Sequence, residues 1–430
     1  MNAQTTGKHY DGRVPWQSDP AKMAYASRLQ GLSLRDFEAQ ADMARMIDYR
    51  YGRLQEALQA ADCAAALLMG SVNLRYATGT RFAQVFNMRS PFRAAFVPAS
   101  GKAVLYDWEG YSLHGLPDVI GERRDAQVSA YWYAGERHGD VATHWAEEIA
   151  SLSREHGGDN KRIALDIAEP GITLALAAAG LDVVSAMPLV EQAAAIKNED
   201  ELFCMAATVA IAETGLARIR DTIRPGLTDQ ALWAELHHEN ASSGGEWIEY
   251  RLAGSGGRTN PWGQEVSDKR IRAGELFGID TGLIGPFGYD ADISRTFYCP
   301  PGKPSDEQRR LYTAALENIE HNLALVEPGL SFREFSHKSW PTPDEFKARS
   351  YAMVSHGVGM GDSWPSIPHP WAWEREGYDG ELQENMVITI ESCIGREDGL
   401  ECVKLEEMVV VTPDGCQLLS TFPFEEDLML

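Results

Sequence analysis

Five side chains that could together hold divalent metal ions lie between residues 280 and 406 of this 430-residue chain: Asp280, Asp292, His356, Glu391 and Glu406. Hard divalent cations take several anionic oxygens and accept an imidazole as a further ligand. Without a cation, four carboxylates packed together would repel one another and their pKa values would rise. Because each of the five lies in a short apolar stretch, the pattern predicts a buried site for one or two ions.

Ion pairing is the simpler alternative. Glu391 lies within MVITIESCI and Glu406 within VKLEEMVVV, so both are charged residues in otherwise apolar strands. An unpaired carboxylate there would cost several kcal/mol, and a nearby cation such as Arg295 or Lys404 could remove that cost. Pairing would be the better explanation for any one of the acids, but the set of five in this order favours a metal site.

The first half of the chain alternates helices and strands. Apolar periodicity predicts helices over residues 36–62, 139–156 and 172–180, and strands over 63–69, 93–99, 102–108, 162–167 and 181–185. This alternation is typical of an α/β domain. We therefore expect an N-terminal arm over residues 1–34, an α/β domain over 35–195, and a second domain over 196–430 that opens with a long helix.

The second half contains a short internal repeat. A Pro-Gly pair ends a predicted helix at residues 225–226 and again at 328–329, an offset of 328 − 225 = 103 residues. Thr228 and Ser331 can each cap the helix that follows. The pattern predicts two related α+β halves with the ligands between them, and a hairpin of residues 275–280 and 292–298 that brings Asp280 and Asp292 to one edge.

Composition narrows the function classes. The net charge is 39 − 63 = −24 and there is no long basic run, which argues against nucleic acid and anionic membrane surfaces as partners. No uninterrupted apolar run reaches membrane-spanning length. The six cysteines form no CxxC pair, as expected for buried free thiols in a reducing compartment. We expect a cytoplasmic protein.

The C-terminal half resembles the pita-bread superfamily of methionine aminopeptidase, proline aminopeptidase, prolidase and creatinase. The resemblance is carried by GYDADISRTF, HGVGM, ITIES and VKLEE, on which the five candidate ligands fall at the family's ligand positions. The N-terminal half resembles the creatinase-type domain of the longer members. The implied fold is an α/β creatinase-like domain followed by a pita-bread α+β domain with a pseudo-twofold repeat.

Within the superfamily the chain is most similar to dimethylsulfoniopropionate (DMSP) lyases of the DddP type. The similarity lies in SPFRA (90–94), GGEWIEYRLAGSGGRTNPW (244–262), HGVGMGDSWP (356–365) and FPFEEDLM (422–429). Two histidines of the peptidases are missing, one near residues 258–263 and one seven residues after His356. One feature points the other way: Gly282 stands where the lyases carry a second aspartate, which restores the peptidase form Asp-X-Gly.

The resemblance implies roles for further residues. Asp362 would take the α-proton of a small zwitterionic sulfonium substrate, Tyr351 would lie near that substrate, and aromatic rings would face its cation; the candidates are Trp108, Trp262 and Trp364. One or two divalent ions are implied, iron first, with zinc, manganese or cobalt possible, in a homodimer. The alternatives are a metallo-dipeptidase of Xaa-Pro or prolidase type, a creatinase-like C–N hydrolase, and a non-enzymatic binding module.

Overall fold

The computed structural model describes residues 41–82, 84–107, 116–126 and 132–430. These fall into two compact units, one over Asp42–Ala194 and the other containing Ala195–Leu430. The predicted arm over residues 1–34 and the predicted substrate-binding residue Trp108 lie outside the described residues. Each unit has its own core and is described by itself.

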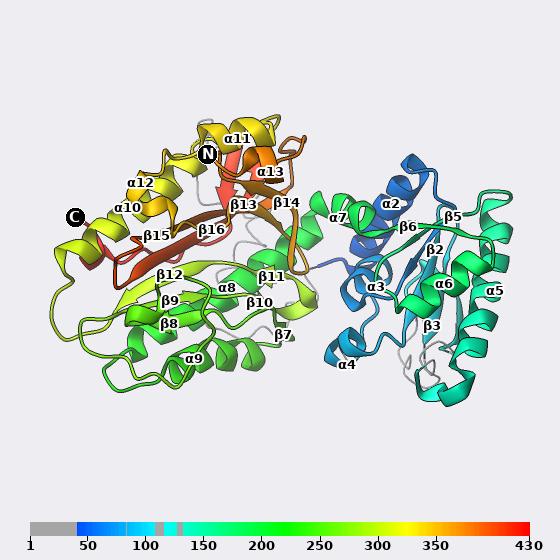
Figure 1. The fold of residues 1–430 in the computed structure, drawn as a ribbon, viewed down its shortest axis with the longest axis horizontal. Coiled ribbons are helices and arrows are strands. Elements are labelled where there is room, and N and C mark those ends of the chain that lie inside the picture. Colours follow the sequence, from blue (N-terminus) through cyan, green and yellow to red (C-terminus); the bar gives the residue numbers. More distant parts are fainter. Residues whose placement is uncertain (1–40, 83, 108–115, 127–131) are drawn as a thin grey trace. The chain divides into compact units, whose positions relative to one another are not determined.

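The unit over Asp42–Ala194 is built on one six-stranded sheet in the order β4-β3-β2-β1-β5-β6 (Figure 1). Its strands are β1 (Ala65–Leu68), β2 (Ala94–Pro98), β3 (Ala103–Asp107), β4 (Ile120–Asp125), β5 (Arg162–Leu165) and β6 (Asp182–Ser185). Its helices are α2 (Met43–Ala60), α3 (Ser71–Thr78), α4 (Gln84–Arg89), α5 (His138–Gly157), α6 (Pro170–Ala178) and α7 (Met187–Ala195), with the 3-10 helix η4 (Trp132–Arg137).

Strand alternation builds the core of this unit. Leu67, Phe96 and Tyr106 point to one face of the sheet and pack with Trp145 and Ile149 of α5. The sequence predicted these strands because their apolar runs are continuous, as expected where both faces are covered. It missed β4, whose residues IGERRD are mostly exposed, and the short helices α3, α4 and α7, which are too brief to show a clear period.

The second unit opens with α8 (Glu199–Thr222), as predicted for residues 196–223. By length and composition α8 could cross a membrane, but 67% of its apolar window is buried against the protein. A core helix has these same properties. The predicted caps are present: Thr228 accepts a hydrogen bond from the Ala231 amide to begin α9 (Asp229–Ser242), and Ser331 accepts one from the Glu334 amide to begin α11 (Phe332–Lys338).

Three sheets follow in this unit, in the orders β11-β10-β7, β12-β9-β8 and β14-β13-β15-β16-β17. The first two use β7 (Trp247–Ile248), β8 (Ala253–Ser255), β9 (Leu276–Asp280), β10 (Leu283–Ile284), β11 (Asp290–Ala291) and β12 (Ser294–Tyr298). The third uses β13 (Met353–Val358), β14 (Asp362–Pro368), β15 (Val387–Gly395), β16 (Cys402–Thr412) and β17 (Gly415–Leu418). The remaining helices are α10 (Asp306–Leu323), α12 (Asp344–Lys347), α13 (Trp373–Glu376), η5 (Gly256–Arg258), η6 (Pro286–Gly288) and η7 (Glu426–Leu428).

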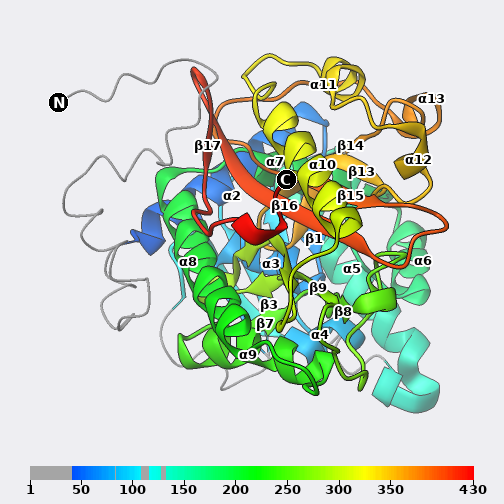
Figure 2. The same ribbon diagram turned by 90° about the vertical axis from the view of Figure 1, so that its left-hand side faces the viewer.

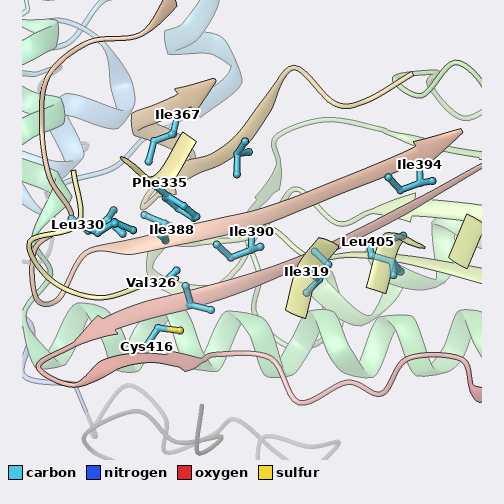
Figure 3. Close-up of a cluster of buried hydrophobic side chains, with 14 of the residues drawn as sticks. Ile319, Val326, Leu330, Phe335, Ile367, Ile388, Ile390, Ile394, Leu405 and Cys416 are labelled. Carbon is cyan, nitrogen blue, oxygen red and sulfur yellow. The ribbon is translucent and has the colours of Figure 1, made fainter. Parts of the chain in front are cut away.

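The five-stranded sheet separates an apolar core from a polar face. Figure 2 shows α10 lying across β15 and β16. Ile319 of α10 packs with Ile388, Ile390 and Leu405 from these strands in the cluster drawn in Figure 3. Because side chains alternate along a strand, the residues directly next to these apolar ones point away from α10. Glu391 and Glu406 are among them, so the core fixes the face on which they lie.

Candidate metal centre

Glu391 and Glu406 lie directly opposite each other in the antiparallel register of β15 and β16. Both are buried, at 2% and 1% exposure. Directly opposed like charges destabilise a strand pair, and burial makes the repulsion stronger because the local dielectric is low. A positive group between the strands is therefore required.

Asp280 and Asp292 reach the same site from the smaller sheets. β9 pairs with β12 as predicted, with Asp280 opposite Ser294, but the connection between them folds into β10, η6 and β11 instead of a simple turn. The hydroxyl of Ser294 donates to Glu406 Oε2 at 2.8 Å. This hydrogen bond ties β12 to β16 and brings both aspartates toward both glutamates.

His356 completes the set from β13. Its Nε2 lies 3.0 Å from Glu391 Oε1, 3.3 Å from Asp292 Oδ2 and 3.7 Å from Glu406 Oε1. Its Nδ1 lies 3.0 Å from the Gly357 carbonyl oxygen and can donate to it. Such a contact fixes the ring so that Nε2 is the ligand nitrogen, as in many metal sites.

Lys404 is the cation that the ion-pair alternative anticipated. It is two residues before Glu406 on β16, so it shares the same face, and it is fully buried. Its ammonium lies 2.7 Å from Glu391 Oε2, 2.8 Å from Glu406 Oε2 and 3.6 Å from Asp280 Oδ2. Arg295, the other anticipated cation, pairs with Glu407 instead. One lysine offsets only part of the charge of four carboxylates.

The remaining charge imbalance appears in the pKa values. Burial and the neighbouring Glu406 raise the pKa of Glu391 to about 7, and burial and Glu406 raise the pKa of Asp292 well above its usual value. Burial opposes ionisation of Glu406 too, but Lys404 and His356 hold its pKa at about 2. Burial would lower the pKa of His356, yet the carboxylates around it raise that pKa well above the usual value. The protein alone must take up protons to hold these groups together.

The residues fit a divalent metal ion. Asp292, His356 and Glu406 each offer a ligand atom, and these atoms lie within 4.8 Å of one another. Within the described part of the chain, Glu406 Oε1 accepts no hydrogen bond although it is buried. Carboxylates with one imidazole suit iron, manganese, cobalt or zinc. The other two acids lie beside this triad: Asp280 is 3.6 Å from Lys404 Nζ, and Glu391 is 3.0 Å from His356 Nε2.

Tyr250 occupies the space beside Gly282. A side chain at Gly282 would begin 2.5 Å from the Tyr250 ring, and the backbone there has φ +41°. The Tyr250 hydroxyl donates 3.2 Å to Asp280 Oδ1 and also contacts Asp292. Burial and these acids raise the pKa of Tyr250 well above its usual value, so the phenol keeps its proton. It therefore acts as a donor that orients both aspartates.

Asp362 begins β14 at the solvent-exposed edge of the site. Partial burial raises the pKa of its carboxyl group, with His356 opposing the rise. Two further acids are close by. Burial and Asp362 raise the pKa of Glu249, and burial, Asp362 and Glu249 raise the pKa of Asp290 well above its usual value.

The predicted substrate-binding residues occupy different positions. Tyr351 lies at the site, with its ring centroid 4.8 Å from Lys404 Nζ. The Trp262 ring packs against Gly278, which shares the Asp280 face of β9, at 2.8 Å from where a side chain there would begin. Trp364 packs edge-to-face against Phe332, with centroids 5.4 Å apart, against the apolar core of the unit.

The sequence analysis did not single out Tyr250, Ser294, Glu249 or Asp290. Asp290 had a usable signal, because it is a further acid only two residues before Asp292, in the motif GYDADISRTF. Tyr250 had none, since its contact with Asp280 is made across 30 residues and depends on the fold.

Family models match both units. Residues 204–413 match metallopeptidase family M24, and residues 50–193 match the creatinase/prolidase N-terminal domain. The Xaa-Pro dipeptidase from Bacillus anthracis has the same fold, with a TM-score of 0.71 at 20% identity, covering 88% of this chain and 99% of that one. The fold and site thus define a protein of the M24 metallopeptidase type, with a creatinase-type domain before a pita-bread domain.

Two curated relatives define the family more closely. Dimethylsulfoniopropionate lyase DddP from Roseovarius nubinhibens is 34% identical over 394 residues, which cover 90% of this chain and 88% of that protein. Its counterpart from Roseobacter denitrificans is 31% identical, with the same coverage. The chain belongs to the DddP family of DMSP lyases and is an enzyme, as the resemblance in its motifs predicted.

Proposed function

We propose that this protein cleaves DMSP to dimethyl sulfide and acrylate with the help of a divalent metal ion. The observation that carries the proposal is the position of Asp362, an exposed carboxylate at the start of β14, in register with Val358 of β13 and six residues after the candidate ligand His356. A base at this position would take a proton from the carbon next to a substrate carboxylate bound at the ligand cluster. The 34% identity to a DMSP lyase supports the same substrate.

The proposed ligands are Asp280, Asp292, His356, Glu391 and Glu406. A bound ion would supply Lewis acidity to a substrate carboxylate and so make the neighbouring C–H more acidic. The protein's own groups prepare the site for this. Tyr250 and Ser294 donate hydrogen bonds to ligand carboxylates, and Lys404 offsets negative charge that the ion leaves uncompensated.

Asp362 takes the α-proton in the proposed elimination. The electron pair of the broken C–H bond forms the new carbon–carbon double bond, and the C–S bond breaks with its electron pair remaining on sulfur. The sulfonium leaves as neutral dimethyl sulfide, acrylate remains, and Asp362 later returns its proton to water. The raised pKa of Asp362 makes it a stronger base than an ordinary aspartate.

Further residues would take part in binding. Tyr351, held beside Lys404, would donate a hydrogen bond to the substrate carboxylate, and the resemblance implies Trp262, Trp364 and Trp108 as aromatic faces for the cation. Iron is the first candidate for the metal, before zinc, manganese or cobalt. We also propose that the enzyme works as a homodimer in the cytoplasm, on the basis of the resemblance.

A direct assay separates this proposal from its main alternative. Metal-loaded protein is incubated with DMSP, with dimethyl sulfide measured by headspace gas chromatography and acrylate by liquid chromatography, and in parallel with Xaa-Pro dipeptides, with free proline measured. The proposal requires equal amounts of the two lyase products and no proline. Proline release without dimethyl sulfide would replace it by a prolidase-type activity, and dimethyl sulfide formed equally well by boiled protein would refute catalysis.

A further inference from the structure

Asp290 is an unusual group in this unit. It is 0% exposed, and neither carboxylate oxygen accepts a hydrogen bond from any described residue. An ionised carboxylate in such a position is costly unless a positive charge lies nearby. The buried acid therefore points to a cation that the protein does not itself provide.

The surroundings of Asp290 are acidic and lead toward solvent. Its amide donates to the Gly359 carbonyl at 2.8 Å, and this contact brings β11 against the turn between β13 and β14 (Figure 1). Glu249 lies on the other side of the same turn, with Oε1 3.3 Å from where a side chain at Gly361 would begin. Asp362 follows Gly361 directly. Glu249 and Asp362 are both exposed, so a group from solvent can reach both of them.

Strand register puts the acids on one face. In the sheet β11-β10-β7, Asp290 pairs with Ile284, and the Glu249 amide donates to the Gly282 carbonyl one pleat further along. Asp292 follows the end of β11 directly, and its carboxylate lies 3.3 Å from His356 Nε2, so Asp290 is two residues from the ligand cluster. The three acids Glu249, Asp290 and Asp362 are thus adjacent to the ligand cluster. Asp362 lies between this cluster and the other two acids.

We infer that Glu249, Asp290 and Asp362 form a subsite for the positively charged end of the substrate, with Asp290 as its buried carboxyl group. The inference rests on the proposed function, in which the other end of the substrate is a carboxylate bound at the ligand cluster. A fully alkylated onium group has no N–H or O–H to donate, so charge and not hydrogen-bond geometry must recognise it. Buried charge acts over a longer range than exposed charge because water screens it less.

The arrangement also orders the substrate. Its carboxylate would lie at the ligands, its α-carbon at Asp362, and its onium group over Glu249 and Asp290. The subsite would thereby hold the α-proton at the base and favour zwitterionic over simple anionic acids. Asp290 would determine specificity without touching the reacting atoms.

A matched pair of ligands tests this by binding, without turnover. The ligands are 3-(trimethylammonio)propionate and its isostere 4,4-dimethylpentanoate, which has a neutral tert-butyl group in place of the trimethylammonium; both are titrated into metal-loaded protein by calorimetry. Wild-type protein should bind the onium acid at least about tenfold more tightly. Asp290→Asn should reduce this preference severalfold while affinity for the isostere changes little, and Glu249→Gln should do the same. Glu320→Gln, on the exposed side of α10, removes the same charge and should keep the preference.

The outcomes are distinct from those of the lyase assay. Equal affinity of wild-type protein for both ligands, or a full preference in both Asp290→Asn and Glu249→Gln, would overturn the subsite. Having two variants guards against one that does not fold. A preference for the onium acid that depends on Asp290 would support the subsite even if no dimethyl sulfide were released, whereas release of dimethyl sulfide without the preference would leave the proposed function and remove the subsite.

Discussion

Glu391 and Glu406 are direct cross-strand partners in the centre of a buried sheet, with the Lys404 ammonium 2.7 and 2.8 Å from one oxygen of each. Two acids in this relationship cannot both be ionised without positive charge between them. The lysine provides one positive charge, and the two aspartates that meet the glutamates call for more. The electrostatics of this pair link metal binding, stability and catalysis.

Asp362→Asn should lower kcat for dimethyl sulfide release by roughly 100-fold or more, the usual contribution of a general base. The amide is isosteric but cannot take a proton, so the melting temperature and metal content should remain those of the wild type. Asp379→Asn, at an exposed position, serves as the matched control. An Asp362→Asn enzyme that works at the wild-type rate would remove Asp362 from the mechanism.

Metal binding should stabilise the protein more at pH 7.5 than at pH 5.5. The folded-state pKa of Glu391, about 7 without metal, lies above its ordinary value of 4.5, so the metal-free fold holds a proton that the unfolded chain releases. Its stability contribution is present below pH 4.5 and is lost as the pH rises toward 7. A divalent ion binds the ionised form, so its affinity rises over the same interval. Thermal shifts on metal addition measure this, and equal shifts at both pH values would contradict the linkage.

Lys404→Met should destabilise the metal-free protein by about 3–5 kcal/mol, the usual cost of leaving buried charges without their partner. Urea denaturation in the presence of a chelator measures this loss. Added metal should recover part of it, because the ion neutralises the same carboxylates. Lys338→Met breaks an exposed pair with Glu334 and should cost less than about 1 kcal/mol. Similar losses in the two variants would show that Lys404 does not balance the cluster.

Gly282→Ala should cost more than glycine replacement at a comparable open turn. The new methyl group would begin 2.5 Å from the Tyr250 ring, which must then shift away from Asp280. At Gly226 the backbone also has positive φ but nothing lies within 4 Å, so Gly226→Ala carries only the backbone cost of about 1–2 kcal/mol. A further loss of about 1–3 kcal/mol is expected at Gly282 from overpacking, together with weaker metal binding. Equal unfolding free energies for the two variants would rule out the contact.

Strand alternation explains why much of the site was predictable. In β15 and β16 the apolar residues Ile388, Ile390 and Leu405 pack against α10. Glu391 and Glu406 each follow one of these residues directly, so they point to the other face. The caps at Thr228 and Ser331 were predictable because they depend only on local sequence. The contact of Tyr250 with Asp280 and the burial of the unpaired Asp290 beneath an exposed turn arise from segments brought together by folding. No local sequence pattern predicts them.

Elemental analysis of the purified protein tests the central claim most directly, which is that a divalent ion holds these acids together. After loading with iron, manganese, zinc or cobalt and removal of free metal, wild-type protein should retain at least one ion per chain, and His356→Ala should retain markedly less. Wild-type protein that remains folded and releases dimethyl sulfide with no bound metal would contradict the account.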